Sequence, residues 1–410
     1  MRVDCLRPGS GMALLVSVAR SAIPFALAIA FVGGASANTI DSAPRTVSYE
    51  IASKALGETR TLLLRTPPAH DDKATLPVVY VLDGEWNFEI VAAYVDYMVD
   101  NGVFPPMAIA GAINVNRNRD YLPKPDQYFP DSGGGAAYLD FVENEWIPSV
   151  ERRISASGER VLIGHSFGGV ATLNALFERP DLFDGYIALS ASAWIADRIL
   201  FDKARDYFDD HPEDVAFVYM SAGEFDGGPT TPSGRELAEI FAARASGALD
   251  WSFEVTPAAE HFRNFTTGLD RAFQKLIPYV GLVDEALEAG RIDGAAVDAW
   301  AAKKSSELGF RFFPPWFDLG VAATSLAGEG HKEGARALAA LVIRYHAEDP
   351  NAAAFNAQTL EAVGDLEAAV DEYRRAIAIT KARELHPNEI HFDRLRAGVA
   401  RIEKKITERD

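Results

Sequence analysis

The sequence contains almost no cysteine. Cys5 is the only one among 410 residues, and it precedes an apolar stretch near the N-terminus rather than following it, as a lipid-anchor cysteine would. One cysteine cannot form an internal disulfide, and thiolate zinc sites need several. The H-E-x-x-H pattern of zinc hydrolases is also absent from the sequence, so we expect neither a metal ion nor another cofactor.

Positive charge is scarce as well. Lys and Arg number 40 against 59 Asp and Glu, which gives a formal net charge of −19. Binding to a phosphate backbone needs a basic face, so the composition argues against a nucleic-acid partner. Hydrophobic residues make up 48% of the chain, which is enough for a full α/β domain and a second unit.

The first 37 residues have the pattern of a secretory signal. Arg2, Arg7 and Arg20 precede the apolar run AIPFALAIAFVGG, which is followed by ASA at residues 35–37. The run is too short to span a bilayer comfortably, although an uncleaved anchor is the alternative. We expect a signal peptide at residues 1–37, a bacterial protein that is periplasmic or secreted, and no stable membrane span after cleavage.

Short apolar runs dominate the next part of the chain. Residues 45–66 alternate as in an antiparallel hairpin, and nearly continuous apolar segments follow, separated by helical patterns. These segments read LPVVYVLDG, MAIAGAINV, RVLIG, GYIALSAS and VAFVYMSAG, and LDWSFEVT closes the series. Strands buried on both faces have this appearance, so we predict an α/β domain at residues 38–280 with a mostly parallel central sheet flanked by helices.

The remainder, residues 281–410, is predicted to be all-α. Gly330 and Gly364 lie 34 residues apart, as do Ala335 and Ala369, and 34 is the period of a tetratricopeptide helix pair. The first copy has Ala339 where that repeat has an aromatic residue. We predict a tetratricopeptide-like helical domain that contacts a protein partner or a second copy of the chain. The alternative is an ordinary helical appendage whose periodicity arose by chance.

One serine stands in a tight turn between a strand and a helix. The sequence GHSFG at residues 164–168 matches G-x-S-x-G, follows RVLI and precedes an apolar helical pattern. This arrangement is typical of the nucleophile elbow of α/β-hydrolases, which exposes the serine hydroxyl above the sheet edge. The amide of Phe167, at the start of the helix, is a candidate oxyanion donor. The alternative is a glycine-rich turn that only packs the helix on the sheet.

A serine needs a base, and the fold predicts the chain order Ser, acid, His. His261 follows the last predicted strand and is the only histidine after Ser166 at such a position. Asp226 and Glu224 both follow the preceding strand, and we favour Asp226, three residues after Gly223, as the acid.

Further site residues follow from the same topology. The second oxyanion donor is expected in the loop after LPVVYVLDG, with the amides of Glu85 and Trp86 as candidates. Trp86, Trp194, Arg119 and His165 are candidates for the substrate pocket, and buried packing is the alternative for both tryptophans.

The order of these segments resembles a known family. LDGEWNF, NRDYLPKP, GGGAAYLDFVENEWIPSVERRI, LIGHSFGG, FDGYIALSASAWIAD, SAGEFDGG and EHFRNF occur in the order and spacing of the Putative esterase family of α/β-hydrolases. That family includes siderophore esterases, the esterase D group and mycolyltransferases. The resemblance covers residues 45–278 and implies Ser166 as nucleophile, His261 as base and Asp226 as acid. The family often has proline where this chain reads SASAW, so the local pocket differs.

We therefore predict a serine hydrolase that cleaves carboxylic esters of small molecules through a Ser-His-Asp triad and an acyl-enzyme. One alternative is an acyltransferase that uses the same triad with an alcohol acceptor. The other is an interaction protein of the tetratricopeptide type with an inert hydrolase domain.

Overall fold

The computed structural model describes residues 45–67, 75–101, 103–211, 213, 216–277, 295, 297–299, 301–303, 314–382 and 389–409. The expected signal peptide and the expected domain boundary near residue 280 lie outside these residues.

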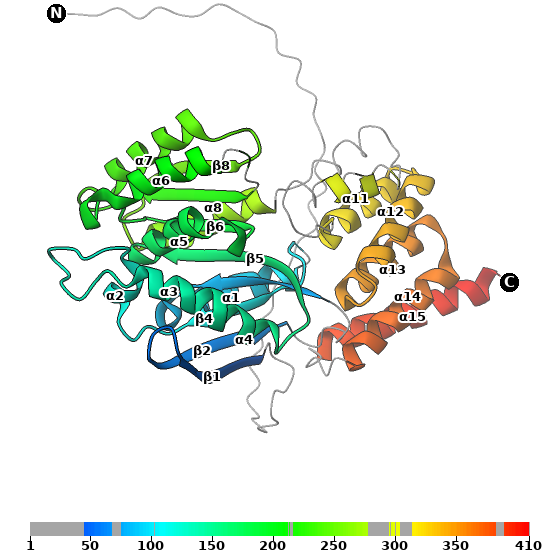
Figure 1. Ribbon diagram of the computed structural model, residues 1–410. Helices are drawn as coiled ribbons and strands as arrows, with labels where there is room; N and C mark the ends of the chain where they lie inside the picture. The colour runs from blue at the N-terminus through cyan, green and yellow to red at the C-terminus, as the bar shows by residue number, and fades with distance from the viewer. Residues whose placement is uncertain are drawn as a thin grey trace, which may run out of the picture. The chain divides into compact units, whose positions relative to one another are not determined.

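Eight strands form one sheet in the order β1-β2-β4-β3-β5-β6-β7-β8. β1 pairs antiparallel with β2, β2 pairs antiparallel with β4, and every other pairing is parallel, so the predicted mostly parallel sheet and its leading hairpin are confirmed (Figure 1). The strands are β1 Arg45–Ser53, β2 Glu58–Thr66, β3 Leu76–Val81, β4 Ala108–Ala112, β5 Ala156–His165, β6 Gly185–Leu189, β7 Phe217–Gly223 and β8 Asp250–Thr256.

Helices cover both faces of the sheet. The helices are α1 Gly84–Asp100, α2 Arg117–Tyr121, α3 Gly135–Phe141, α4 Ile147–Glu151, α5 Phe167–Glu178, α6 Ile199–Asp210, α7 Thr230–Arg244 and α8 Arg263–Leu276. Short 3₁₀ turns lie at Pro180–Leu182 and Ala196–Arg198. The apolar residues of α1 and α8 share one core with one side of the strands, and those of α2 to α7 share the other. This layering buries both faces of the parallel strands, as their continuous apolar sequences require.

One predicted helix is interrupted. The segment AAYLDFVENEWIPSVERRI forms α3, a π-helical turn at Val142–Trp146, and then α4. Pro148 lies in the first turn of α4 and has no N–H to donate to the preceding turn. The wider turn accommodates that missing donor and places Trp146 fully in the core.

The strand order places several loops at one edge of the sheet. β3 has β4 on one side and β5 on the other, so the loops after β3 and β5 leave the sheet at a point where the chain reverses direction. Open parallel sheets bind ligands at the carboxyl ends of their strands near such a point. The loops after β7 and β8 leave at the same edge. We call the part from β1 to α8 the α/β region.

The rest of the described chain is helical and is called the helical region. Its helices are α11 Trp316–Gly328, α12 Lys332–Tyr345, α13 Pro350–Val363, α14 Leu366–Ala382 and α15 Glu389–Arg409, and consecutive helices pack together. α13 begins 34 residues after α11, and α14 begins 34 residues after α12. Within the described part of the chain, no helix is both long and apolar enough for a bilayer crossing.

Candidate active site

Ser166 lies at the junction of β5 and α5 in a strained conformation. Its φ of 60° and ψ of −116° are unusual for a residue with a side chain, and its N–H donates to the Leu189 carbonyl at 3.0 Å. Gly164 allows this sharp turn, because a Cβ at that position would lie 2.2 Å from the Gly168 carbonyl oxygen. The local sequence therefore fixes an elbow that leaves the serine half-exposed.

His261 and Asp226 meet across two loops. His261 Nδ1 lies 2.6 Å from Asp226 Oδ1, and the Asp226 side chain is fully buried while that of His261 is 27% exposed. The loops that carry them are joined by backbone hydrogen bonds, since the amides of Glu224 and Phe225 donate to the carbonyls of Thr256 and Ala259. The loop after β7 and the loop after β8 thus position one acid–base pair.

The Asp226 carboxylate has several donors. Its Oδ2 accepts from the Gly223 N–H at 3.2 Å, and the Ser190 hydroxyl also bonds to the carboxylate. Burial alone would raise the pKa of Asp226, but the hydrogen bonds from His261 and Ser190 outweigh burial and hold the pKa below its usual value. Asn264 Nδ2 donates to Ser190 Oγ at 2.9 Å, which directs the Ser190 proton toward Asp226.

Glu224, the alternative acid, is oriented elsewhere. It is exposed, and its Oε2 accepts from the Ala258 N–H at 2.8 Å, so it braces the loop before His261 rather than the imidazole.

The structure does not join Ser166 to His261 by a hydrogen bond. Among the described residues, Ser166 Oγ has one hydrogen-bond partner, Ser192 Oγ at 3.5 Å. Catalytic hydrogen bonds are often long in enzymes without substrate and tighten in the complex. Ser192 is buried beside the elbow, and no sequence motif marks it.

Two backbone amides near Ser166 have no hydrogen-bond partner among the described residues, those of Phe167 and Glu85. Phe167 starts α5 and Glu85 lies in the first turn of α1, where N–H groups lack partners within the helix. The amide of Trp86 donates to the Asp83 carbonyl at 2.9 Å. Of the two candidates for the second oxyanion donor, Trp86 thus has a paired N–H in this structure and Glu85 does not.

A buried ion pair supports the loop that carries Glu85. Asp83 is 1% exposed and has a left-handed backbone conformation. Its carboxylate accepts hydrogen bonds from Arg117 Nε at 2.6 Å and from Arg117 Nη2 at 2.8 Å. Asn114 Nδ2 joins Asp83 Oδ1 and Glu85 Oε1 at 2.7 and 2.8 Å. Burial would lower the pKa of Arg117, but Asp83 raises it above its ordinary value, so the guanidinium stays charged.

Two of the predicted pocket residues have other roles. Arg119 bonds to both oxygens of Glu58, at 2.7 and 3.0 Å, and to Asp120 at 2.7 Å, so its donors are engaged in an ion cluster. Trp194 packs against the core, with its Nε1 buried and unpartnered in the described part of the chain. Neither side chain is available as predicted, because Arg119 is paired and Trp194 is packed.

His165 also does not line a pocket. Its side chain is buried and its Nε2 lies 2.9 Å from the backbone carbonyl oxygen of His261. Burial, followed by the charge of His261, lowers the pKa of His165 to about 4.

Exposed aromatic side chains surround the elbow. Trp86, Phe225 and Phe262 are 61%, 66% and 76% exposed, and each follows the carboxyl end of a strand. The Arg117 guanidinium lies 5.6 Å from the centre of the Trp86 ring and 5.3 Å from that of Phe167. Of the predicted pocket residues, only Trp86 is exposed. Sequence reasoning did not single out Phe225 and Phe262, which adjoin Asp226 and His261 in the chain.

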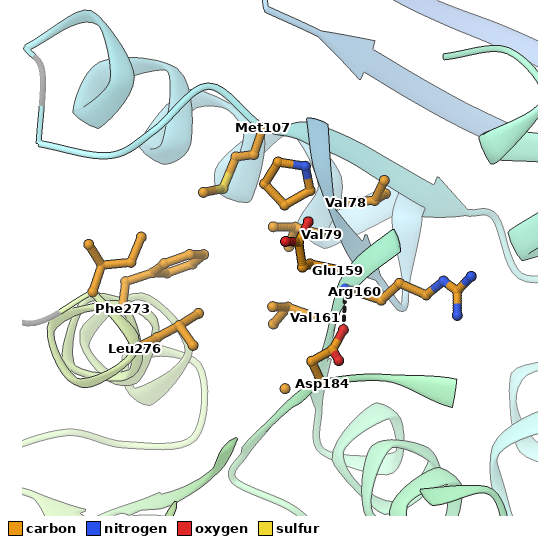
Figure 2. A pocket seen from close by; sticks show the side chains of 12 residues that line it. Val78, Val79, Met107, Glu159, Arg160, Val161, Asp184, Phe273 and Leu276 are labelled. Atoms are coloured by element: carbon orange, nitrogen blue, oxygen red, sulfur yellow. Dashed lines mark hydrogen bonds between the residues drawn. The ribbon is translucent and has the colours of Figure 1, made fainter. Parts of the chain in front are cut away.

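A separate apolar pocket lies at the opposite edge of the sheet (Figure 2). Met107, directly before β4, and Gly185, the first residue of β6, line it together with Phe273 and Leu276 of α8. Arg160 and Asp184 lie beside it, joined through the Arg160 N–H at 2.8 Å. It is therefore distinct from the site at residue 166. Among the described residues, no group of three or more His, Cys, Asp or Glu is placed to hold a metal ion.

Comparison with known proteins finds relatives of this chain. The chain is 31% identical over 167 residues to the siderophore triacetylfusarinine C esterase of Aspergillus fumigatus, covering 37% of this chain and 57% of that protein. It is 30% identical over 173 residues to the siderophore enterobactin esterase of Emericella nidulans, covering 39% and 50%. The chain thus spans only about half of the length of these curated relatives.

A solved structure of an IroE-like serine hydrolase from Shewanella oneidensis has the same fold. Its TM-score is 0.58 at 23% sequence identity, with 72% of this chain and 98% of that chain covered. The family model described as Putative esterase matches residues 53–276, more than half of the chain. The protein is therefore a member of the Putative esterase family.

Proposed function

We propose that the protein hydrolyses carboxylic esters, with Ser166 as nucleophile, His261 as general base and Asp226 as the acid that orients the imidazole. The observation that carries this proposal is the 2.6 Å contact between His261 Nδ1 and Asp226 Oδ1, next to a serine in the strained backbone of an elbow. Membership of the esterase family supports the same reaction class.

In the acylation step, Ser166 Oγ attacks the ester carbonyl carbon while His261 Nε2 takes the hydroxyl proton. Asp226 holds Nδ1–H and stabilises the imidazolium that forms. The C–O bond of the ester then breaks, and the alcohol leaves with the proton from His261. A water molecule then attacks the acyl carbon while His261 Nε2 takes its proton. The bond to Ser166 Oγ breaks, and Oγ receives that proton from His261.

The negative charge that develops on the carbonyl oxygen is assigned to the amides of Phe167 and Glu85. Both point from helix first turns, where free N–H groups and the helix dipole favour an anion. Loss of one such donor typically lowers kcat by about 100- to 1,000-fold.

The test is a fluorophosphonate probe together with p-nitrophenyl acetate. We expect the probe to modify one residue, Ser166, and we expect Ser166→Ala to lower kcat by about 10⁴-fold or more with an unchanged melting temperature. Turnover by this variant at the wild-type rate, or a wild-type protein inert to the probe, would exclude the proposal.

For the substrate, we propose an ester that carries apolar or aromatic groups, with ester-linked siderophores as the first candidates. The names of two relatives and the exposed rings of Trp86, Phe225 and Phe262 support this choice. A panel of p-nitrophenyl and aryl esters of rising acyl size, with an ester-linked siderophore, tests it by kcat/KM. Equal values for acetate and aryl esters would contradict it.

For location, we propose export across a membrane with removal of residues 1–37, as their sequence pattern predicts. N-terminal sequencing of the mature protein tests this, and an intact Met1 would exclude cleavage.

For the helical region, we propose tetratricopeptide-like repeats that bind a protein partner or a second copy. The 34-residue offsets between helix starts support this proposal. Light scattering of the whole chain distinguishes self-association from a monomer that serves another partner.

A further inference from the structure

We propose that His165 is a positioning residue that sets the distance between the nucleophile and the base by holding the backbone of His261. The inference rests on the proposed function only for its kinetic test. It concerns His165, the residue directly before Ser166. The sequence predicts a substrate-pocket role for this histidine.

The contacts of His165 connect two parts of the candidate site. Its Nε2 lies 2.9 Å from the His261 carbonyl oxygen, and the two imidazole ring centres are 4.5 Å apart. Its own carbonyl oxygen accepts from Arg117 Nη2 at 3.2 Å. Phe265 packs edge-on against the His165 ring at 5.6 Å, which restricts its rotation. The side chain is therefore a fixed link of known direction.

This link acts where the chain gives no other direct one. Ser166 belongs to β5 and α5, whereas His261 lies in the loop between β8 and α8, and no hydrogen bond joins their side chains among the described residues. Asp226 fixes the imidazole of His261 but not its distance from the elbow. Because His165 and Ser166 are consecutive, a bond from the His165 ring to the His261 backbone ties the base to the elbow.

The chemistry of the bond determines the proton on His165. A carbonyl oxygen only accepts, so Nε2 must carry hydrogen, and the neutral ring has the Nε2–H tautomer. The groups that face it are His261, Arg117 and Asp226, and burial together with the first two lowers its pKa to about 4. His165 thus remains uncharged when His261 becomes an imidazolium during turnover.

The kinetic experiment compares His165→Phe with His165→Gln. Phenylalanine keeps the ring volume and removes the donor, whereas glutamine keeps an N–H donor at similar reach. We expect His165→Phe to lower kcat for p-nitrophenyl acetate and the rate of fluorophosphonate labelling by about 10- to 100-fold, as small misplacements do. KM should change by no more than about twofold, and His165→Gln should retain activity within about threefold.

His346 offers a matched control. It is a half-buried histidine in the helical region, and its Nε2 donates to the Pro314 carbonyl oxygen at 2.7 Å. His346→Phe removes the same type of hydrogen bond without touching Ser166, His261 or Asp226, so we expect kcat to remain unchanged. Equal losses in His346→Phe and His165→Phe would overturn the inference, as would wild-type kcat in His165→Phe or a His165→Gln variant as slow as His165→Phe.

A second measurement does not depend on activity. In ¹⁵N-histidine-labelled whole protein, with His165 assigned by its loss in His165→Gln, we expect the Nε2–H tautomer and no protonation between pH 7 and pH 5.5. An Nδ1–H tautomer, or titration with an ordinary midpoint near 6.5, would overturn the inference. If wild-type protein fails to react with the fluorophosphonate, the proposed function fails and this spectrum still decides the role of His165.

Discussion

The α/β region and the helical region differ in which residues adopt a left-handed backbone conformation. Seven non-glycine residues among those described have positive φ, and all belong to the α/β region: Asp83, Ser166, Ser190, Ala196, Asp197, Arg198 and Ala258. In the described helical region, positive φ occurs only at Gly330 and Gly364, with values of 88° and 93°.

The difference separates the edge of the sheet that holds the candidate active site from the ends of ordinary helices. Ser166 and Ser190 directly follow β5 and β6, and Asp83 and Ala258 lie two residues after the ends of β3 and β8. Each such residue costs about 1–3 kcal/mol and persists only where its surroundings hold it, as the buried ion pair holds Asp83. The turns at Gly330 and Gly364 have no such constraint, and glycine forms them without strain. Four of the seven strained residues thus lie at the edge of the sheet that holds the candidate active site, and the other three form the 3₁₀ turn before α6.

The largest effect on kcat is expected for Asp226, the proposed acid at the strained edge of the sheet. We expect Asp226→Asn to lower kcat for p-nitrophenyl acetate by about 10⁴-fold, because an amide no longer stabilises the correct imidazole tautomer and the imidazolium. Steady-state kinetics with circular dichroism of the folded variant check this.

Glu224→Gln is its matched control. The amide oxygen of glutamine can still accept from the Ala258 N–H, so the loop is retained and kcat should stay within about threefold. A larger loss in Glu224→Gln than in Asp226→Asn would reassign the acid.

A smaller effect concerns pH and stability. The folded pKa of His165 is about 4, against 6.5 for the ordinary group. As the pH falls below about 6.5, His165 therefore becomes protonated in the unfolded chain but stays neutral in the native protein. The contribution of His165 to the free energy of unfolding, about 3 kcal/mol, is present at neutral pH and is lost as the pH approaches 4.

Urea unfolding at pH 7, 5.5 and 4.5 measures this contribution. His165→Gln has no titrating group at this position, so its free energy of unfolding should fall less steeply with acid than that of the wild type. Parallel curves for the two proteins would show that His165 titrates normally.

The smallest effects test strain directly. Ser166→Gly should unfold at a higher free energy than Ser166→Ala, by about 1 kcal/mol, because glycine adopts positive φ freely. Gly364→Ala should lower the free energy of unfolding by about 1 kcal/mol for the same reason, since no atom lies within 4 Å of the added Cβ and only the backbone is strained. Chemical unfolding curves measure both, and a Ser166→Gly variant no more stable than Ser166→Ala would show that the elbow carries no backbone strain.

The sequence predicted the sheet, its hairpin and the elbow because strand patterns and the G-x-S-x-G turn are local features. It also brought Asp226 and His261 into consideration, since chain order and strand ends determine which loops share an edge. It did not distinguish Arg117 from Arg119, which are two residues apart on the short helix α2. Side chains so spaced project in nearly opposite directions, and only the packed structure shows which one meets Asp83.

The residues that support Asp226 could not be predicted from the sequence for a related reason. Ser190 and Asn264 lie 74 positions apart and meet only through the packing of α8 on the sheet. No local pattern marks such a pair. His165 was noticed only as a neighbour of Ser166, and its direction toward the His261 carbonyl depends on the position of a loop 96 residues away.

Because β8 is an edge strand and the last strand in the sequence, the nascent chain completes the candidate site late in synthesis. Ser166 emerges from the ribosome 95 residues before His261, and the loop that bears His261 is fixed only when β8 pairs with β7. Until then Ser166 has no base beside it, and His165 has no His261 carbonyl to which it can donate. Under the proposed mechanism the protein is synthesised inert, and it becomes a hydrolase only with the addition of its last strand.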